Sequence, residues 1–381
     1  MTYQQIVPTQ TLQKSDKILF LIHLAIGDFT YMQNIFRTIK QRHPHLQLDI
    51  FVLENRCTTD SSKWPLLKNY VIYDWLESCG LFRKVYRENY APHLIKKSIL
   101  EAQQENYPIA VVLSSMPEFQ TEILAREIVG KHGLLIGQKS RFKWHRPIRS
   151  IIKRRASRDL DLYYKTKKLK PGEHISAAYN SWCEQLIGVT LSPEERLPYI
   201  DIPPLWQKRV ADKIKSLQNN TVKNSPVLFI NYLAKDPKRS WRIEQALMLV
   251  QLLQQKDSLK NSLFILNTIP EKQKNLDQAI YNRNLNSTFS FSATDNFYQL
   301  PAMLQLSDLI ISVETSIIHL ANAVKKPVIA LMRQRTPQWV PLDKKLSTVI
   351  WVPNKKDHVT AISPSTVTAV LENYLSSKKR S

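Results

Sequence analysis

The chain has 381 residues, of which 43% are hydrophobic and 23% are charged, an ordinary composition for a globular protein. This composition excludes a wholly disordered chain, a collagen-like fibre and a disulfide-stapled miniprotein, and the length predicts about two domains. Lysine and arginine number 54 against 32 acidic residues, a formal net charge of +22, which favours acidic partners such as nucleic acid, an anionic membrane or phosphorylated substrates.

Signals for targeting and for disulfides are few. The three cysteines, Cys57, Cys79 and Cys183, form no CxxC pair, so neither a zinc cluster nor a disulfide framework is indicated. The polar start of the chain lacks the apolar core of a signal peptide. The strongest apolar run, 18–26, is about half as long as a membrane span. We expect a cytoplasmic protein that does not cross the membrane.

Apolar runs alternate with helical patterns along the first half of the chain. The run at 17–26 is typical of a strand that is buried on both faces of a parallel sheet, and it precedes a helix expected at about 31–42. Further strands are expected at 46–53, 108–115 and 133–138. Strands that alternate with helices through short connections predict a doubly wound α/β domain.

The same pattern restarts after a proline-rich stretch at 197–206. Strands are expected there at 226–234, 262–268, 287–293, 308–314, 327–332 and 348–353. All seven glycines lie at or before Gly188, so the second half must build its turns from Asn, Asp, Ser and Pro. We predict two α/β domains of similar size, at 1–200 and 201–381.

The positive charge is concentrated in residues 139–170, which contain thirteen lysines and arginines but only two acids. Aromatic and aliphatic residues interleave with these cations, which suits an anionic bilayer surface or a phosphate backbone. A solvated loop is the simpler alternative. The candidate membrane- or acceptor-binding residues are Arg141, Lys143, Arg146, Arg149, Lys153, Arg154 and Arg155.

Residues that directly follow the expected strands are the candidates for chemistry, since ligands of α/β proteins bind at the carboxyl ends of strands. Asp28 follows the first strand and can act as the general base for a hydroxyl nucleophile. Alternatively, it is the N-cap of a helix that begins near Phe29. Lys235, Lys238 and Arg239 follow the strand at 226–234 and can neutralise a diphosphate, although they also suit a charged surface turn.

A third candidate group follows the strand at 308–314. Thr315 or Ser316 is a suitable helix N-cap, and a helix start offers free N–H groups and a favourable dipole to phosphate. Glu314 can accept hydrogen bonds from a ribose diol. His319 lies in the same helix start, where it either contributes to the site or packs into the core with its ring bonded to a backbone carbonyl.

Several sharper motifs are absent from the sequence. It contains no GxGxxG and no GxxxxGK[ST], which disfavours the usual dinucleotide and P-loop fingerprints. It contains neither HExxH nor GxSxG. The nearest relative of a metal-binding DxD pair, at 159–161, follows no expected strand.

Four segments in this order carry a family resemblance: ILFLIHLAIGDF (18–29), INYLAKDPKRSW (230–241), SDLIISVETSIIHLANAVKKPVIAL (307–331), and Trp339 with Pro341. Together they resemble glycosyltransferase family 9, the lipopolysaccharide heptosyltransferases. The third segment is similar to the family's pattern ADLVIGVDTGLAHLAAALGKPVVAL and is the most specific. Residues 55–200 match none of the family's motifs.

This resemblance implies the GT-B architecture, in which two Rossmann-like domains face each other across a cleft. The N-terminal domain would take the acceptor and the C-terminal domain the nucleotide sugar. It also implies inverting transfer of a heptose from an ADP-activated donor to the inner core of lipopolysaccharide or lipooligosaccharide, without a cofactor or a required metal. Asp28 matches the family's general base. The family's other matching positions are the basic diphosphate-binding loop (Lys235, Lys238, Arg239), the acidic nucleotide-binding position (Glu314) and the DTGxxHL motif (Thr315, Ser316, His319).

The sequence departs from the family pattern at the proposed donor site. Glu314 replaces an aspartate, Ser316 replaces a glycine, and Arg333-Gln334 replaces a Gly-Pro pair. These changes leave the donor open. We expect a nucleotide-sugar donor, a phosphorylated lipid A-core acceptor and an anionic membrane surface as partners, and no nucleic acid. The alternatives are a sugar-nucleotide isomerase of the same architecture and a basic nucleic-acid-binding protein.

Overall fold

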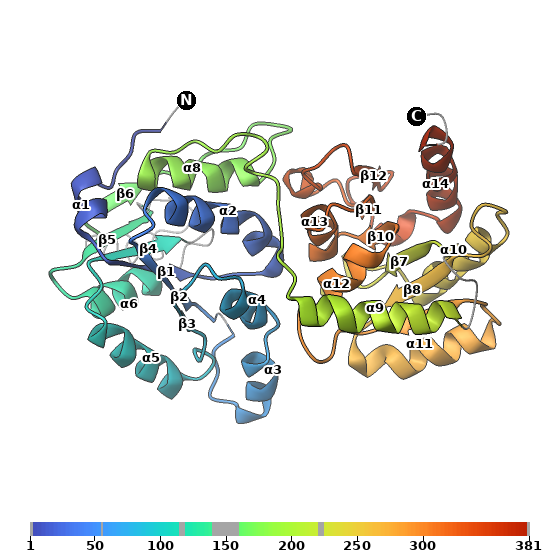
Figure 1. Ribbon diagram of the computed structural model, residues 1–381, viewed down its shortest axis with the longest axis horizontal. Helices are drawn as coiled ribbons and strands as arrows, with labels where there is room; N and C mark the ends of the chain where they lie inside the picture. The colour runs from blue at the N-terminus through green and yellow to red at the C-terminus, as the bar shows by residue number, and fades with distance from the viewer. Residues whose placement is uncertain (1–2, 55, 114–118, 139–159, 220–224, 379–381) are drawn as a thin grey trace. The chain divides into compact units, whose positions relative to one another are not determined.

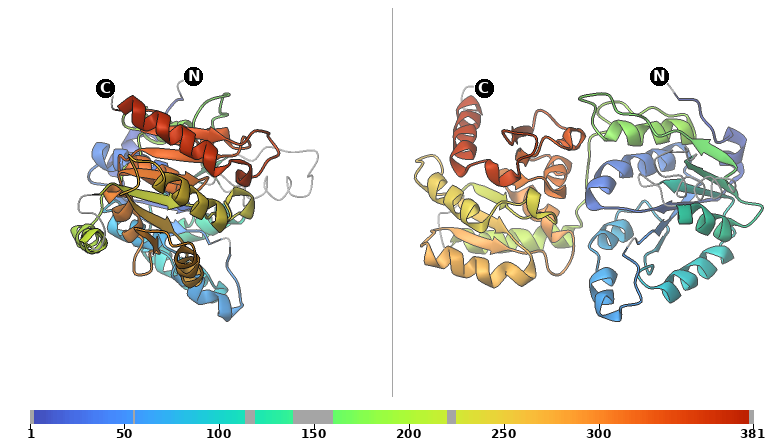
Figure 2. Two further views of the ribbon diagram at one scale, coloured as in Figure 1. Left: turned by 90° about the vertical axis from the view of Figure 1, so that its right-hand side faces the viewer. Right: turned by 180° about the vertical axis from the view of Figure 1, so that it is seen from behind.

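The chain forms two compact units, Met1–Arg196 and Leu197–Ser381 (Figure 1). The computed structural model describes residues 3–54, 56–113, 119–138, 160–219 and 225–378. Each unit contains one six-stranded sheet, and every strand pairing within the described residues is parallel. Helices cover both faces of each sheet, as the further views show (Figure 2). The predicted α/β class with two Rossmann-like sheets is therefore confirmed.

The first unit has the strand order β3-β2-β1-β4-β5-β6. Its strands are β1 (Lys17–Ile22), β2 (Gln47–Val52), β3 (Lys84–Tyr86), β4 (Ile109–Leu113), β5 (Leu134–Gln138) and β6 (Leu162–Tyr164). Its helices are α1 (Thr9–Lys14), α2 (Ile26–Arg42), α3 (Trp64–Lys68), α4 (Ile72–Ser78), α5 (Pro92–Gln104), α6 (Phe119–Val129) and α8 (Ser176–Ile187). The strand order reverses between β1 and β4, which is where open α/β sheets bind ligands.

Buried side chains fix the helices of this unit on the sheet. Residues of α5 and α6 share one apolar cluster with β1, β2, β4 and β5. Helix α2 contributes Phe36, whose ring meets Phe20 of β1 edge-on at 4.9 Å, and α2 packs against α8. All residues of α8 are buried, and the helix ends at Gly188, whose φ of +70° is left-handed and favours glycine. Helices α2 and α8 thus form a rigid pair beside the carboxyl end of β1.

The second unit repeats this topology with the order β12-β11-β10-β7-β8-β9. Its strands are β7 (Val227–Asn231), β8 (Leu263–Asn267), β9 (Thr288–Phe291), β10 (Leu309–Val313), β11 (Val328–Met332) and β12 (Ser347–Trp351). Its helices are α9 (Pro204–Asn219), α10 (Ile243–Gln254), α11 (Pro270–Asn282), α12 (Gln299–Leu306), α13 (Ser316–Ala323) and α14 (Pro364–Lys378). Here the order reverses between β7 and β10, so this unit has its own switch point.

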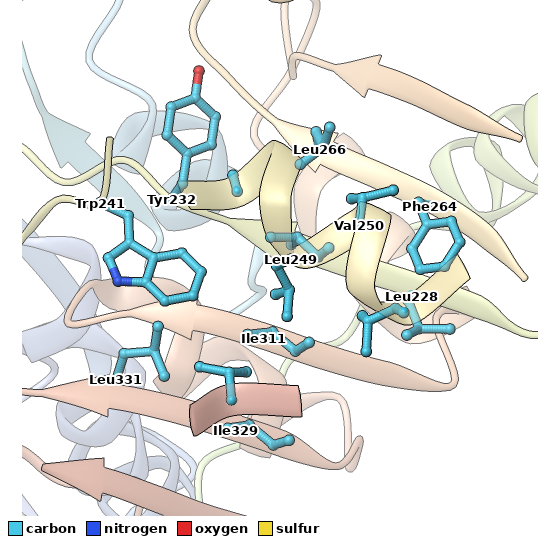
Figure 3. Close-up of a cluster of buried hydrophobic side chains, with 14 of the residues drawn as sticks. Leu228, Tyr232, Trp241, Leu249, Val250, Phe264, Leu266, Ile311, Ile329 and Leu331 are labelled. Atoms are coloured by element: carbon cyan, nitrogen blue, oxygen red, sulfur yellow. The ribbon is translucent and has the colours of Figure 1, made fainter. Parts of the chain in front are cut away.

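A large apolar cluster holds α10, α11 and α14 against one face of the second sheet. Alternate residues of neighbouring strands point into it, because successive side chains of a strand face opposite sides. Figure 3 shows Tyr232 and Trp241 at one end of this cluster and Leu228 and Phe264 at the other. The end with Tyr232 and Trp241 lies at the carboxyl edge of the sheet, so the core reaches directly under the candidate loop at 235–239.

Two details of the predicted elements differ from the structure. The apolar run at 17–26 is not one strand, because β1 ends at Ile22 and α2 already begins at Ile26. The run continues because Leu24 is buried between the two elements, and burial alone does not separate strand from helix. Strands β3 and β6 have three residues each and are too short to show a pattern.

The basic residues Arg141, Lys143, Arg146, Arg149, Lys153, Arg154 and Arg155 lie outside the described residues. The membrane- or acceptor-binding role predicted for them stays a prediction. No helix within the described parts of the chain combines the length and the apolar character needed to cross a membrane.

Candidate active-site residues in the two units

Asp28 lies in the first turn of α2, directly after β1 at the switch point of the first sheet. The helix begins at Ile26 and its N-cap is Ala25, which makes no side-chain capping bond. The alternative in which Asp28 caps a helix starting near Phe29 is therefore wrong. Asp28 is instead the third residue of the helix, where its carboxylate is half-buried and the backbone N–H groups of Ala25 and Asp28 act to lower its pKa.

The hydroxyl of Tyr179 on α8 donates a hydrogen bond to Oδ1 of Asp28 at 2.6 Å. The Tyr179 ring in turn packs on Trp182, with ring centroids 5.2 Å apart. Burial raises the pKa of Asp28 above its ordinary value, and the Tyr179 hydrogen bond partly opposes this rise. Burial and the nearby Asp28 carboxylate raise the pKa of Tyr179 well above its ordinary value, so the tyrosine remains a donor. A carboxylate whose pKa is raised is a stronger base.

The sequence analysis missed Tyr179, because it found no recognisable motif within residues 55–200. Its contact with Asp28 joins positions 151 residues apart, and only the packing of α2 against α8 brings them together.

A polar rim surrounds Asp28 at the carboxyl ends of β1 and β2. His23 places Nδ1 2.9 Å from the carbonyl of Leu53, and its charge favours the ionised form of Asp28, lowering that pKa. The Tyr70 hydroxyl lies 3.3 Å from the carbonyl of Leu24, and burial raises the pKa of Tyr70 to about 12. The Arg56 guanidinium stacks 4.6 Å from the centroid of the Tyr70 ring. Arg56 is itself paired with Glu54, at 2.7 Å and 2.6 Å, so this rim carries an ion pair and hydrogen-bonding groups.

In the second unit, the predicted basic loop follows β7 and is held by its own backbone. The Trp241 N–H donates to the carbonyl of Tyr232 at 2.8 Å, and the Ala234 N–H donates to Oγ of Ser240 at 2.9 Å. Between them runs the short turn η3 (Pro237–Arg239), whose N-cap Asp236 accepts the N–H of Lys238 at 3.0 Å. The loop thus presents its cations from a fixed frame.

The N-terminus of α13 lies at the carboxyl end of β10, next to β7 in the sheet. Thr315 is the N-cap, and its hydroxyl accepts the N–H of Ile317 at 3.3 Å. The buried Asn231 at the end of β7 donates to the hydroxyls of Ser312 at 3.0 Å and Thr315 at 3.3 Å. One of the two predicted N-caps is therefore confirmed as Thr315, and Asn231, which the sequence analysis missed, links this helix start to β7.

Glu314 is buried, and both of its oxygens accept hydrogen bonds within the unit. Oε1 accepts the hydroxyl of Thr336 at 2.8 Å. Oε2 accepts both the backbone N–H and the Nε–H of Arg333, each at 3.2 Å. Arg333 also places Nη1 3.6 Å from Oδ2 of Asp236 in the basic loop. The basic loop, Arg333 and the residue before α13 are thereby connected by one network of hydrogen bonds and ion pairs.

His319 lies one turn into α13 and is buried. Its ring lies 5.7 Å from the ring of Trp339, centroid to centroid, so the predicted site histidine and the predicted closing tryptophan meet. Among the residues that the structure describes, no group of three or more His, Cys, Asp or Glu side chains is arranged to hold a metal ion.

The model of glycosyltransferase family 9 (heptosyltransferase) matches residues 164–365, which is more than half of the chain. The chain belongs to glycosyltransferase family 9. The matched range contains the basic loop, the start of α13 and Arg333, while Asp28 precedes it. As a member of this family the protein is a glycosyltransferase, and the alternative of a nucleic-acid-binding protein finds no support.

A curated relative of this family 9 glycosyltransferase is a putative lipopolysaccharide heptosyltransferase 4 of Escherichia coli K12. The two are 35% identical over 72 residues, which is 19% of this chain and 18% of the relative. The match therefore spans less than a fifth of either protein.

Solved structures of family 9 glycosyltransferases share the fold over nearly the whole chain. A family 9 glycosyl transferase from Veillonella parvula superposes with a TM-score of 0.71 at 13% identity, covering 95% of this chain and 97% of that chain. The ADP-heptose lipopolysaccharide heptosyltransferase II of E. coli gives 0.65 at 15% identity, with 95% and 99% covered. The E. coli heptosyltransferase WaaC with ADP-2-deoxy-2-fluoro heptose gives 0.61 at 13% identity, with 94% and 99% covered. The GT-B fold class implied by the family resemblance is thus confirmed.

Proposed function

We propose that this glycosyltransferase transfers a heptose from an ADP-activated donor to the inner core of lipopolysaccharide or lipooligosaccharide. Membership in the heptosyltransferase family supports this proposal. So do the solved relatives, one named an ADP-heptose heptosyltransferase and one crystallised with an ADP-heptose analogue. The substitutions at 314, 316 and 333 make the identity of the donor the first point to test.

The observation that carries the proposal for the donor is the ion pair of Arg333 with Asp236, at 3.6 Å. Arg333 also binds Glu314, the residue that precedes the α13 N-cap. Arg333 therefore connects the basic loop to the start of α13. A site with lysines, arginines and a helix N-terminus at one sheet edge suits a nucleoside diphosphate. We assign the donor-binding residues as Lys235, Lys238, Arg239, Glu314, Thr315, Ser316 and His319.

Asp28 is the general base in this proposal. It takes the proton from an acceptor hydroxyl while the hydroxyl oxygen attacks the anomeric carbon of the donor. The bond between that carbon and the diphosphate oxygen breaks, and its electron pair leaves with ADP. Attack opposite to the leaving group inverts the anomeric configuration. The basic loop and the α13 N-terminus stabilise the negative charge that grows on the diphosphate, so the chain supplies the electrostatic contribution with its own groups.

The test is a transfer assay with purified full-length protein, ADP-heptose and a heptose-deficient core acceptor. We expect release of ADP that requires the acceptor, with a product whose new linkage is of opposite anomeric configuration to the donor. UDP- and GDP-sugars serve as matched controls. Transfer from a UDP- or GDP-sugar and not from ADP-heptose would refute ADP-heptose as the donor. Consumption of ADP-heptose without any acceptor would favour a sugar-nucleotide isomerase.

We further propose that the enzyme works in the cytoplasm, bound peripherally to the inner face of the inner membrane through residues 139–155. The +22 charge supports this, because basic segments bind anionic lipid surfaces. Vesicles containing anionic lipid should sediment the protein, and high salt should release it. Neutralising Arg141, Lys143, Arg146, Arg149, Lys153, Arg154 and Arg155 should abolish sedimentation, whereas unchanged sedimentation would rule out this segment.

A further inference from the structure

Arg333 stands directly after β11, at a position where the family pattern has glycine, and it contacts a second departure from that pattern, Glu314. Its backbone N–H and its Nε–H both donate to Oε2 of Glu314 at 3.2 Å. The two departures are therefore one structural unit. An aspartate at 314 would be shorter by one methylene group, so the longer glutamate is suited to reach Arg333.

The Arg333 guanidinium is held between two carboxylates from different segments. Glu314 holds the Nε side, and Asp236 of the basic loop lies 3.6 Å from Nη1. Within the described residues, Nη2 makes neither an ion pair nor a hydrogen bond, and the side chain keeps 10% of its surface exposed. Nε and Nη1 of the guanidinium thus each face a carboxylate, and Nη2 keeps its capacity to donate hydrogen bonds.

The guanidinium lies beside the loop proposed to bind the diphosphate, because its Nη1 is 3.6 Å from Asp236 of that loop. We propose that Arg333 is a diphosphate-binding residue of this enzyme, and that Glu314 and Asp236 position its guanidinium. The inference rests on the proposed donor site. A guanidinium suits phosphate oxygens because its N–H groups form a rigid planar fork. Together with the loop's three cations, Arg333 outnumbers the two carboxylates four to two, so the site keeps a net positive charge.

This assignment changes the role expected for Glu314. Thr336 donates to one of its oxygens, and Arg333 donates twice to the other, so a ribose diol would have to compete with these donors. Glu314 is then a positioning residue that acts through Arg333, and the nucleoside depends on other groups of the unit.

The decisive measurement is the binding of ADP, AMP, adenosine and inorganic pyrophosphate to variants of the full chain by calorimetry. Removing Arg333 alone would leave Glu314 buried without its cation, which can unfold the unit. We therefore use the paired neutral variant Arg333→Met/Glu314→Gln, together with Arg333→Lys, which keeps the charge but loses the fork. Thermal unfolding of each variant verifies that it folds. The matched control is Lys256→Met/Glu372→Gln, which removes a surface ion pair of 2.7 Å between the turn that follows α10 and helix α14.

We expect the paired variant to bind ADP and pyrophosphate about tenfold or more weakly, with adenosine affinity within about twofold of wild type. The affinity of Arg333→Lys for ADP and pyrophosphate should lie between those of wild type and the paired variant. The control should bind all four probes as wild type does. Unchanged ADP and pyrophosphate affinity, or an equal loss for adenosine, would overturn the role of Arg333. Pyrophosphate separates this result from the donor proposal: Arg333-dependent pyrophosphate binding without ADP binding would refute only the ADP donor, while a wild type that binds neither would refute both.

Discussion

Tyr179 donates a 2.6 Å hydrogen bond to the carboxylate of Asp28 and so connects α8 to the first turn of α2. The bond holds the proposed base in one orientation at the carboxyl end of β1. It also opposes the effect of burial on the Asp28 pKa. The tyrosine is therefore placed to set both the direction and the strength of the base.

Replacing Tyr179 with phenylalanine should shift the pH dependence of transfer. The Asp28 pKa rises when a hydrogen bond to its ionised form is lost, and transfer needs that ionised form. The acidic limb of the kcat profile should therefore move to higher pH, with little loss at alkaline pH. Tyr281→Phe, on the exposed surface of α11, is the matched control. If the acidic limb does not shift in Tyr179→Phe, the Tyr179 hydrogen bond does not set the pKa of the general base.

Asp28→Asn should remove activity and stabilise the fold at the same time. Loss of a general base lowers kcat by about 10²- to 10⁴-fold. The folded-state pKa of Asp28 lies above its ordinary value of 3.8, so the ionised carboxylate costs stability once the pH exceeds that raised value. The free energy of unfolding of Asp28→Asn should exceed that of wild type at neutral pH, and the excess should shrink as the pH falls toward 3.8.

Denaturant titrations of both proteins across this pH range measure the difference. Asp212→Asn, which removes an exposed carboxylate paired with Lys208 on α9, is the control and should show no such trend. A variant that is less stable than wild type at neutral pH would contradict the proposed cost of the buried charge.

Lys238→Ala should weaken the binding of ADP about tenfold, because one charge-assisted hydrogen bond is worth about 1.5 kcal/mol or more. Lys238 is exposed, so the fold should be unaffected. The effect should appear in the KM for the donor and not in the KM for the acceptor. Lys260→Ala, an exposed lysine that pairs with Asp257, provides the comparison. If ADP binds both variants equally well, Lys238 does not bind the donor.

Arg83→Met should destabilise the first unit, because it leaves Asp49 without its cation. Asp49 is 0% exposed and accepts hydrogen bonds from Nε of Arg83 at 3.1 Å and from the hydroxyl of Tyr107 at 2.5 Å. Because Arg83 keeps 35% of its side chain exposed and Tyr107 still donates to Asp49, we expect a loss of about 1–3 kcal/mol. The double variant Arg83→Met/Asp49→Asn should recover much of this loss in urea unfolding. Equal stability of the single variant and wild type would contradict the pairing.

The sequence predicted the strands well wherever they are buried on both faces. β10, for example, lies at 309–313, inside the predicted 308–314. Such strands are recognisable because their sequences are continuous apolar runs. The position of the basic loop and of the α13 N-cap followed from the rule that sites lie after strands. These predictions need only local patterns, which a single sequence contains.

Contacts between distant segments could not be predicted in the same way. The pairs Tyr179–Asp28 and Arg333–Glu314 depend on which helices pack together and on which strands are neighbours, and neither is encoded in local spacing. The alternatives for Asp28 were separated only when the helix start was placed at Ile26. Side-chain partners at the ends of strands thus require the topology as well as the motif.

Trp241 is buried under the basic loop, with its indole N–H bonded to the carbonyl of Ile362 at 3.1 Å and its backbone N–H bonded to Tyr232. A free loop with two lysines and an arginine would lose conformational entropy on closing around an anion, and that loss weakens binding. Here the backbone has already lost that freedom when the unit folds. Binding of the anion then has to order little more than the lysine side chains. A smaller entropy loss therefore offsets the favourable free energy of each electrostatic contact.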